Sequence, residues 1–253
     1  MTIDFPKSSD IPSLKALWKE AFGDTDEFID LFFNLAFTEE SALAVYDNNT
    51  LVASLYWFDG SVANKKTAYI YGVATKKAYR GKGYSSALLK RTHDLLAEAG
   101  YSATVLVPAS DGLFNFYGRL GYTECCFIDC YNCSASKKKI SLEKISAEEY
   151  LILRESCLPD NSLIFDNKRL HFLSSITDFY KSQDFIFAKS KDSAALRIIE
   201  FFGNEEFIPS IIYSLGFDKT TVRRYGKMKP FAMYHSLEES VKEIPEYLGF
   251  AFD

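Results

Sequence analysis

Six consecutive residues, Arg80-Gly81-Lys82-Gly83-Tyr84-Ser85, form the segment of this sequence that is best suited to binding chemistry. The two glycines let the backbone adopt positive φ angles and approach a ligand closely. A helical pattern begins at Tyr84, so the loop amides converge where a helix N-terminus carries about half a positive charge. This arrangement is typical of a phosphate or pyrophosphate site. A plain glycine turn is the alternative interpretation.

The region around this loop is strongly basic. Between Ser61 and His93 the chain has eight lysines and arginines and no acidic residue, although the whole chain of 253 residues carries a net charge of −5. A basic island in an acidic protein favours a local anion site, whereas a charge run alone is more often a solvated face. With a pI of about 5.4 and no nucleic-acid-binding motif, we expect no nucleic acid as a partner.

Other nucleotide-binding motifs fit the loop less well. A P-loop needs Gly-Lys-Ser/Thr, but Lys82 is followed by Gly83. A dinucleotide fingerprint needs a third Gly or Ala, and that position is Ser86. It also needs an acidic residue at the end of a second strand, whereas Asp94 and Glu98 fall inside the predicted helix.

A second motif, Phe116-Tyr117-Gly-Arg-Leu-Gly121-Tyr122, lies about 35 residues downstream in a short predicted helix. Together the two motifs resemble those of the GNAT superfamily of N-acetyltransferases. Arg80, Gly83 and Ser85 occupy the fixed positions of the family's Arg/Gln-x-x-Gly-x-Gly/Ala loop, with Ser85 replacing the usual Gly or Ala. The second segment resembles the family's Phe-Tyr-x-x-x-Gly-Phe/Tyr. The resemblance covers roughly residues 1–133.

The resemblance implies an α/β fold with a mixed sheet that is splayed open like a V, and acetyl-CoA as a co-substrate in the opening. It implies an enzyme that transfers acetyl to a primary amine by direct attack on the thioester. The backbone of Val73, Ala74 and Thr75 is expected to pair with the pantetheine arm. The pyrophosphate is expected at Arg80, Gly81, Lys82, Gly83, Tyr84, Ser85 and Ser86.

The resemblance also assigns Tyr117 to the neighbourhood of the thioester sulfur. A phenol with a pKa of about 10 can protonate the departing thiolate; a core tyrosine with a satisfied hydroxyl is the alternative. Many family members carry an Asn seven residues earlier, but Ser110 stands there. A general base is also expected, because the amine has to attack uncharged. The strand glutamate of many members is missing from Tyr69–Val73, which leaves Asp111 and Glu124 as candidates.

Hydrophobic periodicity and turn residues predict the elements that position these motifs. In the first half of the chain, helices are expected at residues 10–22, 24–35, 84–99 and 111–120. Strands are expected at residues 3–6, 42–46, 51–58, 68–74, 103–107 and 122–130. This alternation places the glycine loop between a strand and a helix, as its proposed chemistry requires.

The polar stretch Ser134–Lys139 is the predicted linker between a GNAT domain at 1–133 and a C-terminal α+β domain at 140–253. The second part repeats the order helix, helix, strand, turn, strand of residues 10–58, which indicates either a degenerate GNAT-like repeat or a generic α+β appendage. It has no Arg-x-x-Gly-x-Gly, so we expect one active site. Its predicted helices begin at Ser146 and span 170–180 and 205–215, and its strands span 185–188, 194–202 and 220–224, with a turn at Lys191-Asp192.

This organisation is similar to that of the multi-domain acetyltransferases of the enhanced-intracellular-survival type, in which a C-terminal carboxylate reaches the active site. The chain ends in Tyr247-Leu-Gly-Phe-Ala-Phe-Asp253, which is apolar and aromatic enough to dock. A tail that reaches the cleft is therefore a hypothesis. The chain is too short for the sterol-carrier-like third domain of those enzymes.

The cysteines favour neither a disulfide scaffold nor a metal site. Cys130-x-x-Cys133 has half of a zinc-binding pattern, but no second pair of Cys or His with metal spacing follows. The odd count argues against a secreted disulfide-rich protein. We therefore expect reduced strand cysteines and no metal. The five are Cys125, Cys126, Cys130, Cys133 and Cys157.

The remaining expectations concern location and partners. No apolar run approaches the ~20 residues that span a bilayer, and the N-terminus has no signal-peptide pattern. We therefore expect a cytoplasmic protein without a membrane partner. The resemblance to the family also implies a homodimer. Two alternatives to the N-acetyltransferase stay open: a non-catalytic module that binds or senses acyl-CoA, and another acyl transfer on the same fold.

Overall fold

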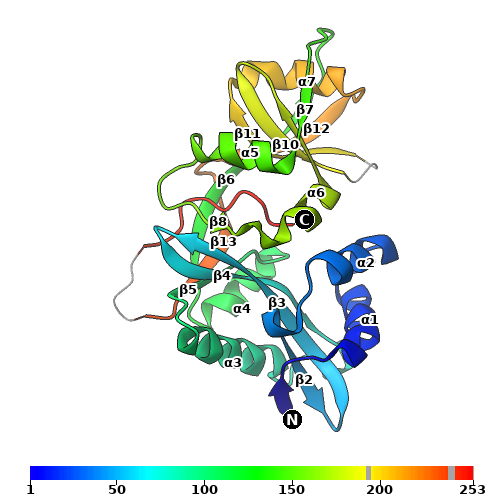
Figure 1. Cartoon of the computed structure of the whole chain (residues 1–253), viewed down its shortest axis with the longest axis vertical. Coiled ribbons are helices and arrows are strands. Elements are labelled where there is room, and N and C mark those ends of the chain that lie inside the picture. The colour runs from blue at the N-terminus through cyan, green and yellow to red at the C-terminus, as the bar shows by residue number, and fades with distance from the viewer. Residues whose placement is uncertain (192–194, 239–242, 253) are drawn as a thin grey trace. The chain divides into compact units, whose positions relative to one another are not determined.

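The computed structural model describes residues 1–191, 195–238 and 243–252, and both of its compact units combine a mixed β-sheet with helices (Figure 1). The predicted α/β class is confirmed. Unit 1 consists of Met1–Thr123, Ile164–Arg169 and Met233–Ile244. Unit 2 consists of Glu124–Leu163, Leu170–Ala232 and Pro245–Asp253.

The chain leaves unit 1 at Thr123, before the predicted linker Ser134–Lys139. That stretch belongs to unit 2, where the Ser136 amide donates to the Pro209 carbonyl at 2.9 Å. The two units interleave along the sequence, whereas the predicted domains are consecutive ranges. A division into domains at 133–140 remains a prediction.

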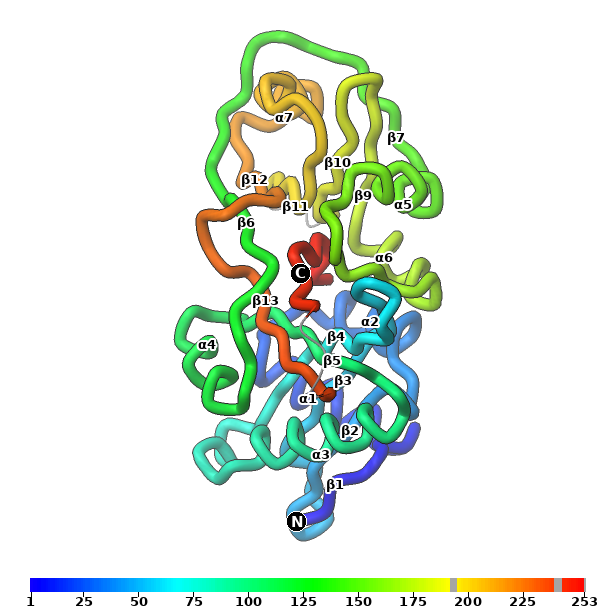
Figure 2. The backbone as a smooth tube through the Cα atoms, turned by 90° about the vertical axis from the view of Figure 1, so that its left-hand side faces the viewer, coloured from blue at the N-terminus to red at the C-terminus, as the bar shows by residue number. Residues whose placement is uncertain are grey.

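The sheet of unit 1 has the strand order β1-β2-β3-β4-β5-β13. Neighbouring strands are antiparallel except β4 and β5, which are parallel. The last strand comes from the C-terminal part of the chain, and Figure 2 shows it beside β5. The bounds are β1 (Thr2–Asp4), β2 (Ala42–Asp47), β3 (Thr50–Val62), β4 (Lys65–Thr75), β5 (Ala103–Leu106) and β13 (Lys229–Ser236), with the short β8 (Ile164–Phe165) against β3.

Helices cover both faces of this sheet because side chains of a strand alternate between its faces. Trp57 of β3 packs in one cluster with Leu88 and Leu89 of α3 (Tyr84–Glu98). Its neighbour Tyr56 instead contacts the ring of Trp18 at 5.5 Å between centroids. The helices on that second face are α1 (Ile11–Phe22) and α2 (Asp26–Leu35), while α4 (Asp111–Gly118) joins α3 on the first.

Unit 2 has the strand order β7-β9-β10-β11-β12-β6. The bounds are β6 (Thr123–Ser134), β7 (Glu143–Ile145), β9 (Thr177–Lys181), β10 (Phe185–Ser190), β11 (Leu196–Gly203) and β12 (Lys219–Tyr225). Its helices are α5 (Ala147–Glu155), α6 (Leu170–Ile176) and α7 (Ile208–Ser214). Ser146 caps α5 by accepting a hydrogen bond from the Glu149 amide, as its capping pattern predicts.

The first five strands of the two units have the same topology. In each, three antiparallel pairings are followed by one parallel pairing, β4 with β5 and β11 with β12. In each, two helices precede the second strand and one lies between the fourth and fifth. This shared order supports the predicted repeat. Each unit receives its sixth strand from the other half of the chain, β13 in unit 1 and β6 in unit 2.

Several predictions for the second half of the chain differ from the structure. The helix expected at 170–180 ends at Ile176 and the chain continues as β9, because the apolar residues there fit both periods. Strands β7, β8 and β13 were not predicted; Pro230 near the start of β13 weakens its strand pattern. The expected turn at Lys191-Asp192 lies partly outside the described residues.

Candidate active site

An opening between strands β4 and β5 dominates the candidate site. The two strands pair only over Thr67–Ile70 and Ala103–Leu106. Strand β4 continues to Thr75, and no described strand pairs with this side of residues 71–75. An extended ligand that carries amide groups can therefore pair with the backbone here, as a further strand would.

A bulge in β4 lies at the start of this opening. The register of β3 with β4 shifts where Gly72 and Val73 stand opposite Leu55. Gly72 has a φ of +60°, and a Cβ there would lie 3.0 Å from the ring of Tyr56 and 3.1 Å from that of Trp18. Only glycine fits this position without strain. Such bulges bend a strand and redirect its backbone groups, often beside active sites.

The glycine loop joins β4 to α3 through a short 3-10 helix (Lys77–Tyr79). Gly81 and Gly83 have φ angles of +76° and +82°, and Gly83 is the N-cap of α3. A Cβ on either glycine would meet no protein atom within 4 Å. The positive φ angles therefore require glycine at both positions. Crowding by neighbouring protein atoms plays no part.

The loop presents unpaired donors beside positive charge. Among the described residues, no acceptor pairs with the backbone amides of residues 81–86, and the first intrahelical bond is from Ala87 to Gly83 at 3.0 Å. Gly83, the N-cap of α3, has no side chain that could accept a hydrogen bond from these amides. Arg80 and Lys82 are exposed next to these amides. An anion can satisfy the amides and the helix dipole together.

Local hydrogen bonds hold this loop in place. Arg80 Nε donates to the Thr75 carbonyl at 3.1 Å, and the hydroxyls of Thr75 and Ser85 lie 2.6 Å apart. The Tyr84 hydroxyl donates to the Asp47 carboxylate at 2.6 Å. The serine that replaces the family's Gly or Ala therefore ties α3 to the end of β4. Its hydroxyl is engaged with Thr75 and does not block the loop.

Tyr117 lies on α4 and is 6% exposed. It belongs to the same hydrophobic cluster against which Val73 and Tyr84 pack, so the structure gathers the three around one core. Burial raises the pKa of Tyr117 to about 12. No described residue accepts a hydrogen bond from its hydroxyl, which disfavours the alternative of a core tyrosine with a satisfied hydroxyl.

Next to Tyr117 is a polar cluster that sequence reasoning missed. The Tyr122 hydroxyl lies 2.9 Å from both Thr104 Oγ1 and His93 Nε2. The His93 ring stacks on His235 with centroids 4.3 Å apart, and burial lowers the pKa of His93 to about 3. The available signal was the position of His93 on α3, four residues after buried Leu89 and three before buried Leu96.

The two candidate bases are both exposed. Asp111 lies in the first turn of α4 and Glu124 lies at the start of β6. Nothing in their surroundings favours one over the other, so both remain predictions. Ser110, at the position of the missing Asn, is the N-cap of α4 and makes no side-chain cap.

The C-terminal segment packs inside unit 2. Tyr247, Phe250 and Phe252 are each at most 4% exposed, and the Phe250 ring lies 6.0 Å from that of Phe179. Asp253, whose carboxylate the tail hypothesis requires, lies outside the described residues. The hypothesis that the tail reaches the cleft therefore remains a prediction.

Three further observations concern the described residues only. No three His, Cys, Asp or Glu side chains converge as a metal site would need, and the five cysteines form no disulfide. No helix in the described ranges has both the length and the apolar character for crossing a membrane.

Comparison with known families agrees with this geometry. Residues 2–125 match the family described as acetyltransferase (GNAT) domain. This segment is a GNAT domain. It contains the open edge of β4, the glycine loop and Tyr117. No curated protein sequence matches the chain.

Solved structures resemble the chain well beyond the GNAT domain. A GCN5-related N-acetyltransferase from Anabaena variabilis ATCC 29413 is similar over 94% of this chain and 73% of its own, with 15% identity and a TM-score of 0.70. A GCN5-related N-acetyltransferase from Kribbella flavida is similar over 93% of this chain and 72% of its own, with 14% identity and a TM-score of 0.66. Eis1 from Mycobacterium abscessus is similar over 94% of this chain and 74% of its own, with 11% identity and a TM-score of 0.65. Most of the chain, unit 2 included, therefore shares the fold of these solved structures.

Proposed function

We propose that this protein is an N-acetyltransferase that moves an acetyl group from acetyl-CoA to a primary amine. The observation that carries the proposal is the row of unpaired amides at residues 81–86, which continues the open edge of β4 and shares a core with Tyr117. The diphosphate of CoA needs unpaired donors such as these amides. Its amide-containing arm needs an open strand edge next to them, such as that of β4. Membership of the GNAT family supports the same assignment.

Acetyl-CoA binding follows from the backbone. The pyrophosphate accepts hydrogen bonds from the amides of the loop, and Arg80 and Lys82 offset its charge. The pantetheine amides pair with Val73, Ala74 and Thr75 on the open edge of β4. This arrangement directs the thioester toward the bulge at Gly72.

The transfer itself is a direct displacement. The uncharged amine nitrogen attacks the thioester carbonyl carbon, a C–N bond forms, and the C–S bond breaks with its electron pair leaving on sulfur. Tyr117 donates its proton to the departing thiolate, and the surplus proton of the amine passes to a base, for which Asp111 and Glu124 are the candidates. Since burial raises the pKa of Tyr117 to about 12, the phenol keeps its proton throughout the neutral range.

Calorimetry with CoA, followed by thiol release from acetyl-CoA with a panel of primary amines, tests this function. We expect saturable turnover with at least one amine and a loss of at least tenfold in kcat for Tyr117→Phe, because general acids typically contribute about 10²–10⁴-fold. Tyr213→Phe, an exposed tyrosine of unit 2, is the matched control and is expected to leave kcat unchanged.

The rate is also expected to rise from pH 7 toward pH 10. A lysine-like amine with a pKa of about 10.4 is only about one part in 2,500 uncharged at pH 7. Tyr117 loses its proton only near pH 12, so its titration does not oppose this rise.

Three outcomes would contradict the proposal. CoA binding without turnover on any amine would indicate a module that senses acyl-CoA, and turnover confined to other acyl groups would indicate a different acyltransferase. Absence of CoA binding would remove the assignment altogether. A homodimer and a cytoplasmic location remain predictions.

A further inference from the structure

Tyr117 has a buried neighbour, Tyr122, for which the proposed reaction gives no role. The two rings meet edge to face, with their centroids 5.7 Å apart and an angle of 66° between their planes. The Tyr122 amide also donates to the Tyr117 carbonyl at 3.2 Å. Aromatic pairs attract each other in this geometry, so the position of one ring constrains the other. Tyr122 therefore contacts the proposed general acid through both its ring and its backbone.

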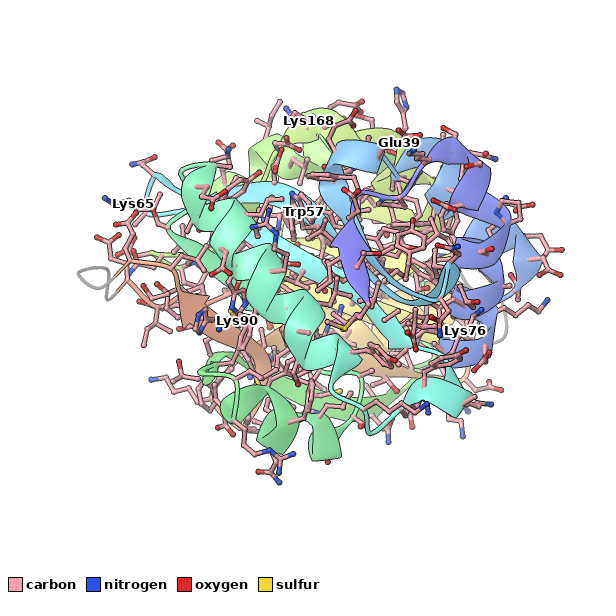
Figure 3. All side chains as sticks on the ribbon, turned by 90° about the horizontal axis from the view of Figure 1, so that it is seen from below. Glu39, Trp57, Lys65, Lys76, Lys90 and Lys168 are labelled. Carbon is pink, nitrogen blue, oxygen red and sulfur yellow. The ribbon has the colours of Figure 1, made fainter. Side chains whose placement is uncertain are left out.

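The Tyr122 hydroxyl is fixed by two other elements of unit 1. Thr104 Oγ1 on β5 and His93 Nε2 on α3 both lie 2.9 Å from it. Figure 3 shows α3, marked by Lys90, across the face of the sheet to which Trp57 belongs. A phenol can donate one hydrogen bond and accept another, and the neutral His93 ring has one nitrogen that accepts and one that donates. Both bonds to the hydroxyl can therefore form at once.

A further contact holds the backbone just before Tyr122. His235 Nδ1 on β13 lies 3.0 Å from the Gly121 carbonyl, to which it can only donate. The His235 ring also stands 5.2 Å from the Tyr122 ring and stacks on His93. A Cβ on Gly121 would lie 3.1 Å from the His235 ring, so the two segments are in close contact. Elements α3, β5 and β13 together thus fix Tyr122.

The hydroxyl of Tyr117 has no such anchor, because no described residue accepts a hydrogen bond from it. Its ring contacts Phe116 at 5.1 Å and Tyr122 at 5.7 Å between centroids. Phe116 lies on the same short helix, whereas Tyr122 is tied to the sheet and to α3. We propose that Tyr122 is a positioning residue, which holds the Tyr117 ring so that its hydroxyl points at the thioester sulfur. This inference rests on the proposed function.

Steady-state kinetics of the full-length protein test this role with Tyr122→Phe, which keeps the ring and removes the hydroxyl. We expect kcat to fall about 5- to 100-fold while the Kd for CoA stays unchanged, because a small misplacement of a catalytic group can cost that much. In the Tyr117→Phe background the same substitution is expected to lower kcat no further, since no acid remains to be positioned. A merely structural role would lower kcat in both backgrounds.

Tyr101→Phe is the matched control. Tyr101 is a buried tyrosine of the same hydrophobic cluster, but its hydroxyl donates to Asp59. This variant is expected to leave kcat unchanged. Thr104→Val removes one anchor of the Tyr122 hydroxyl and is expected to lower kcat by a smaller factor, again without changing the Kd for CoA. It decides the question if circular dichroism shows that Tyr122→Phe does not fold.

NMR of the protein with ¹³C-labelled tyrosine rings adds a measurement that does not depend on turnover. The ring signals of Tyr117, identified by their loss in Tyr117→Phe, are expected to shift or broaden in Tyr122→Phe and to stay unchanged in Tyr101→Phe. Absence of turnover by the wild type would overturn the proposed function and this role with it. In an active enzyme, an unchanged kcat of Tyr122→Phe, an additive loss in the double variant or an unchanged Tyr117 signal would overturn the positioning role alone.

Discussion

The two units differ most at the place where their fourth and fifth strands separate. In unit 1 the pairing of β4 with β5 ends at Ile70, and no described strand covers the rest of that edge. In unit 2 the pairing of β11 with β12 ends at Ile198, and the protein fills the space that follows. Arg223 of β12 donates to the Ile199 carbonyl at 3.1 Å and to the Gly249 carbonyl at 3.4 Å.

A buried ion pair completes the filling of unit 2. Glu200 of β11 is fully buried and accepts hydrogen bonds from Arg154 at 2.8 and 2.9 Å and from the Tyr150 hydroxyl at 2.9 Å. Arg154 also donates to the Leu248 carbonyl at 3.2 Å. Gly249 follows with a φ of +75°, and a Cβ there would lie 2.2 Å from Glu200. The C-terminal segment is therefore built into the position that is open in unit 1.

The same topology is thus completed in two different ways where the fourth and fifth strands separate. Unit 1 keeps the gap open and places a glycine loop at its end, so that a ligand can supply the missing partners. In unit 2 the buried Arg154–Glu200 pair and the C-terminal segment fill this gap. Where unit 1 has the glycine loop, unit 2 has only Gly203 and a short 3-10 turn (Glu205–Phe207) before α7. Fold alone does not determine which unit binds a ligand; the residues at the gap do.

The largest effect is expected from Arg154→Met in unit 2. It leaves Glu200 buried without a counter-charge, which typically costs about 3–5 kcal/mol in the free energy of unfolding. Urea denaturation, together with hydrogen exchange of β11, measures this loss. The double variant Arg154→Met with Glu200→Leu is expected to recover most of it, because well-packed apolar residues can replace such a pair. A loss below about 1 kcal/mol in the single variant would show that the gap in unit 2 is not held by this pair.

Gly83→Ala tests the open gap of unit 1 and has a matched partner in unit 2. Gly83 and Gly216 have φ angles of +82° and +81°, and neither has a protein atom within 4 Å of a built Cβ. Each alanine is expected to cost about 1–2 kcal/mol in folding stability. Only Gly83→Ala is expected to raise the Kd for CoA, by at least tenfold, in calorimetry. Equal Kd values for the two variants would separate the loop from CoA binding.

The smallest effect is a pH dependence confined to unit 1. Burial lowers the pKa of His93 to about 3, so between pH 6.5 and pH 3 the unfolded chain takes up a proton that the folded chain refuses. Stability contributed by the neutral ring is therefore present above pH 6.5 and is lost as the pH falls. The neighbours of the ring are His235, which also disfavours its charge, and the Tyr122 hydroxyl.

Between pH 7.5 and pH 5.5 we expect the wild type to lose about 1 kcal/mol more unfolding free energy than His93→Gln does. Urea titrations at the two pH values measure the difference. His171→Gln, an exposed histidine of unit 2, is the control and is expected to behave like the wild type. Identical pH dependence of His93→Gln and wild type would contradict this assignment.

The parts of the molecule that the sequence predicted are those with a local signature. Positive φ angles demand glycine, so Gly81 and Gly83 marked the loop, and the helix that follows has regular apolar spacing. The contacts that could not be predicted are long-range. Glu200 stands alone among apolar strand residues, and only the structure pairs it with Arg154, 46 positions away. Similarly, His93 meets Tyr122 and His235 only in the folded sheet.

The sixth strand of unit 1 has a consequence for how the chain is made. Strand β5 pairs with β13, whose residues are synthesised more than a hundred positions later. Until the ribosome has released that segment, the edge of β5 that faces away from β4 has no partner from within the chain and can recruit strands from other molecules. A fragment that stops at residue 133 shares this exposed edge. Unit 1 is therefore expected to complete its sheet only after β13 has been synthesised, and a truncation before that strand is a poor way to dissect the protein.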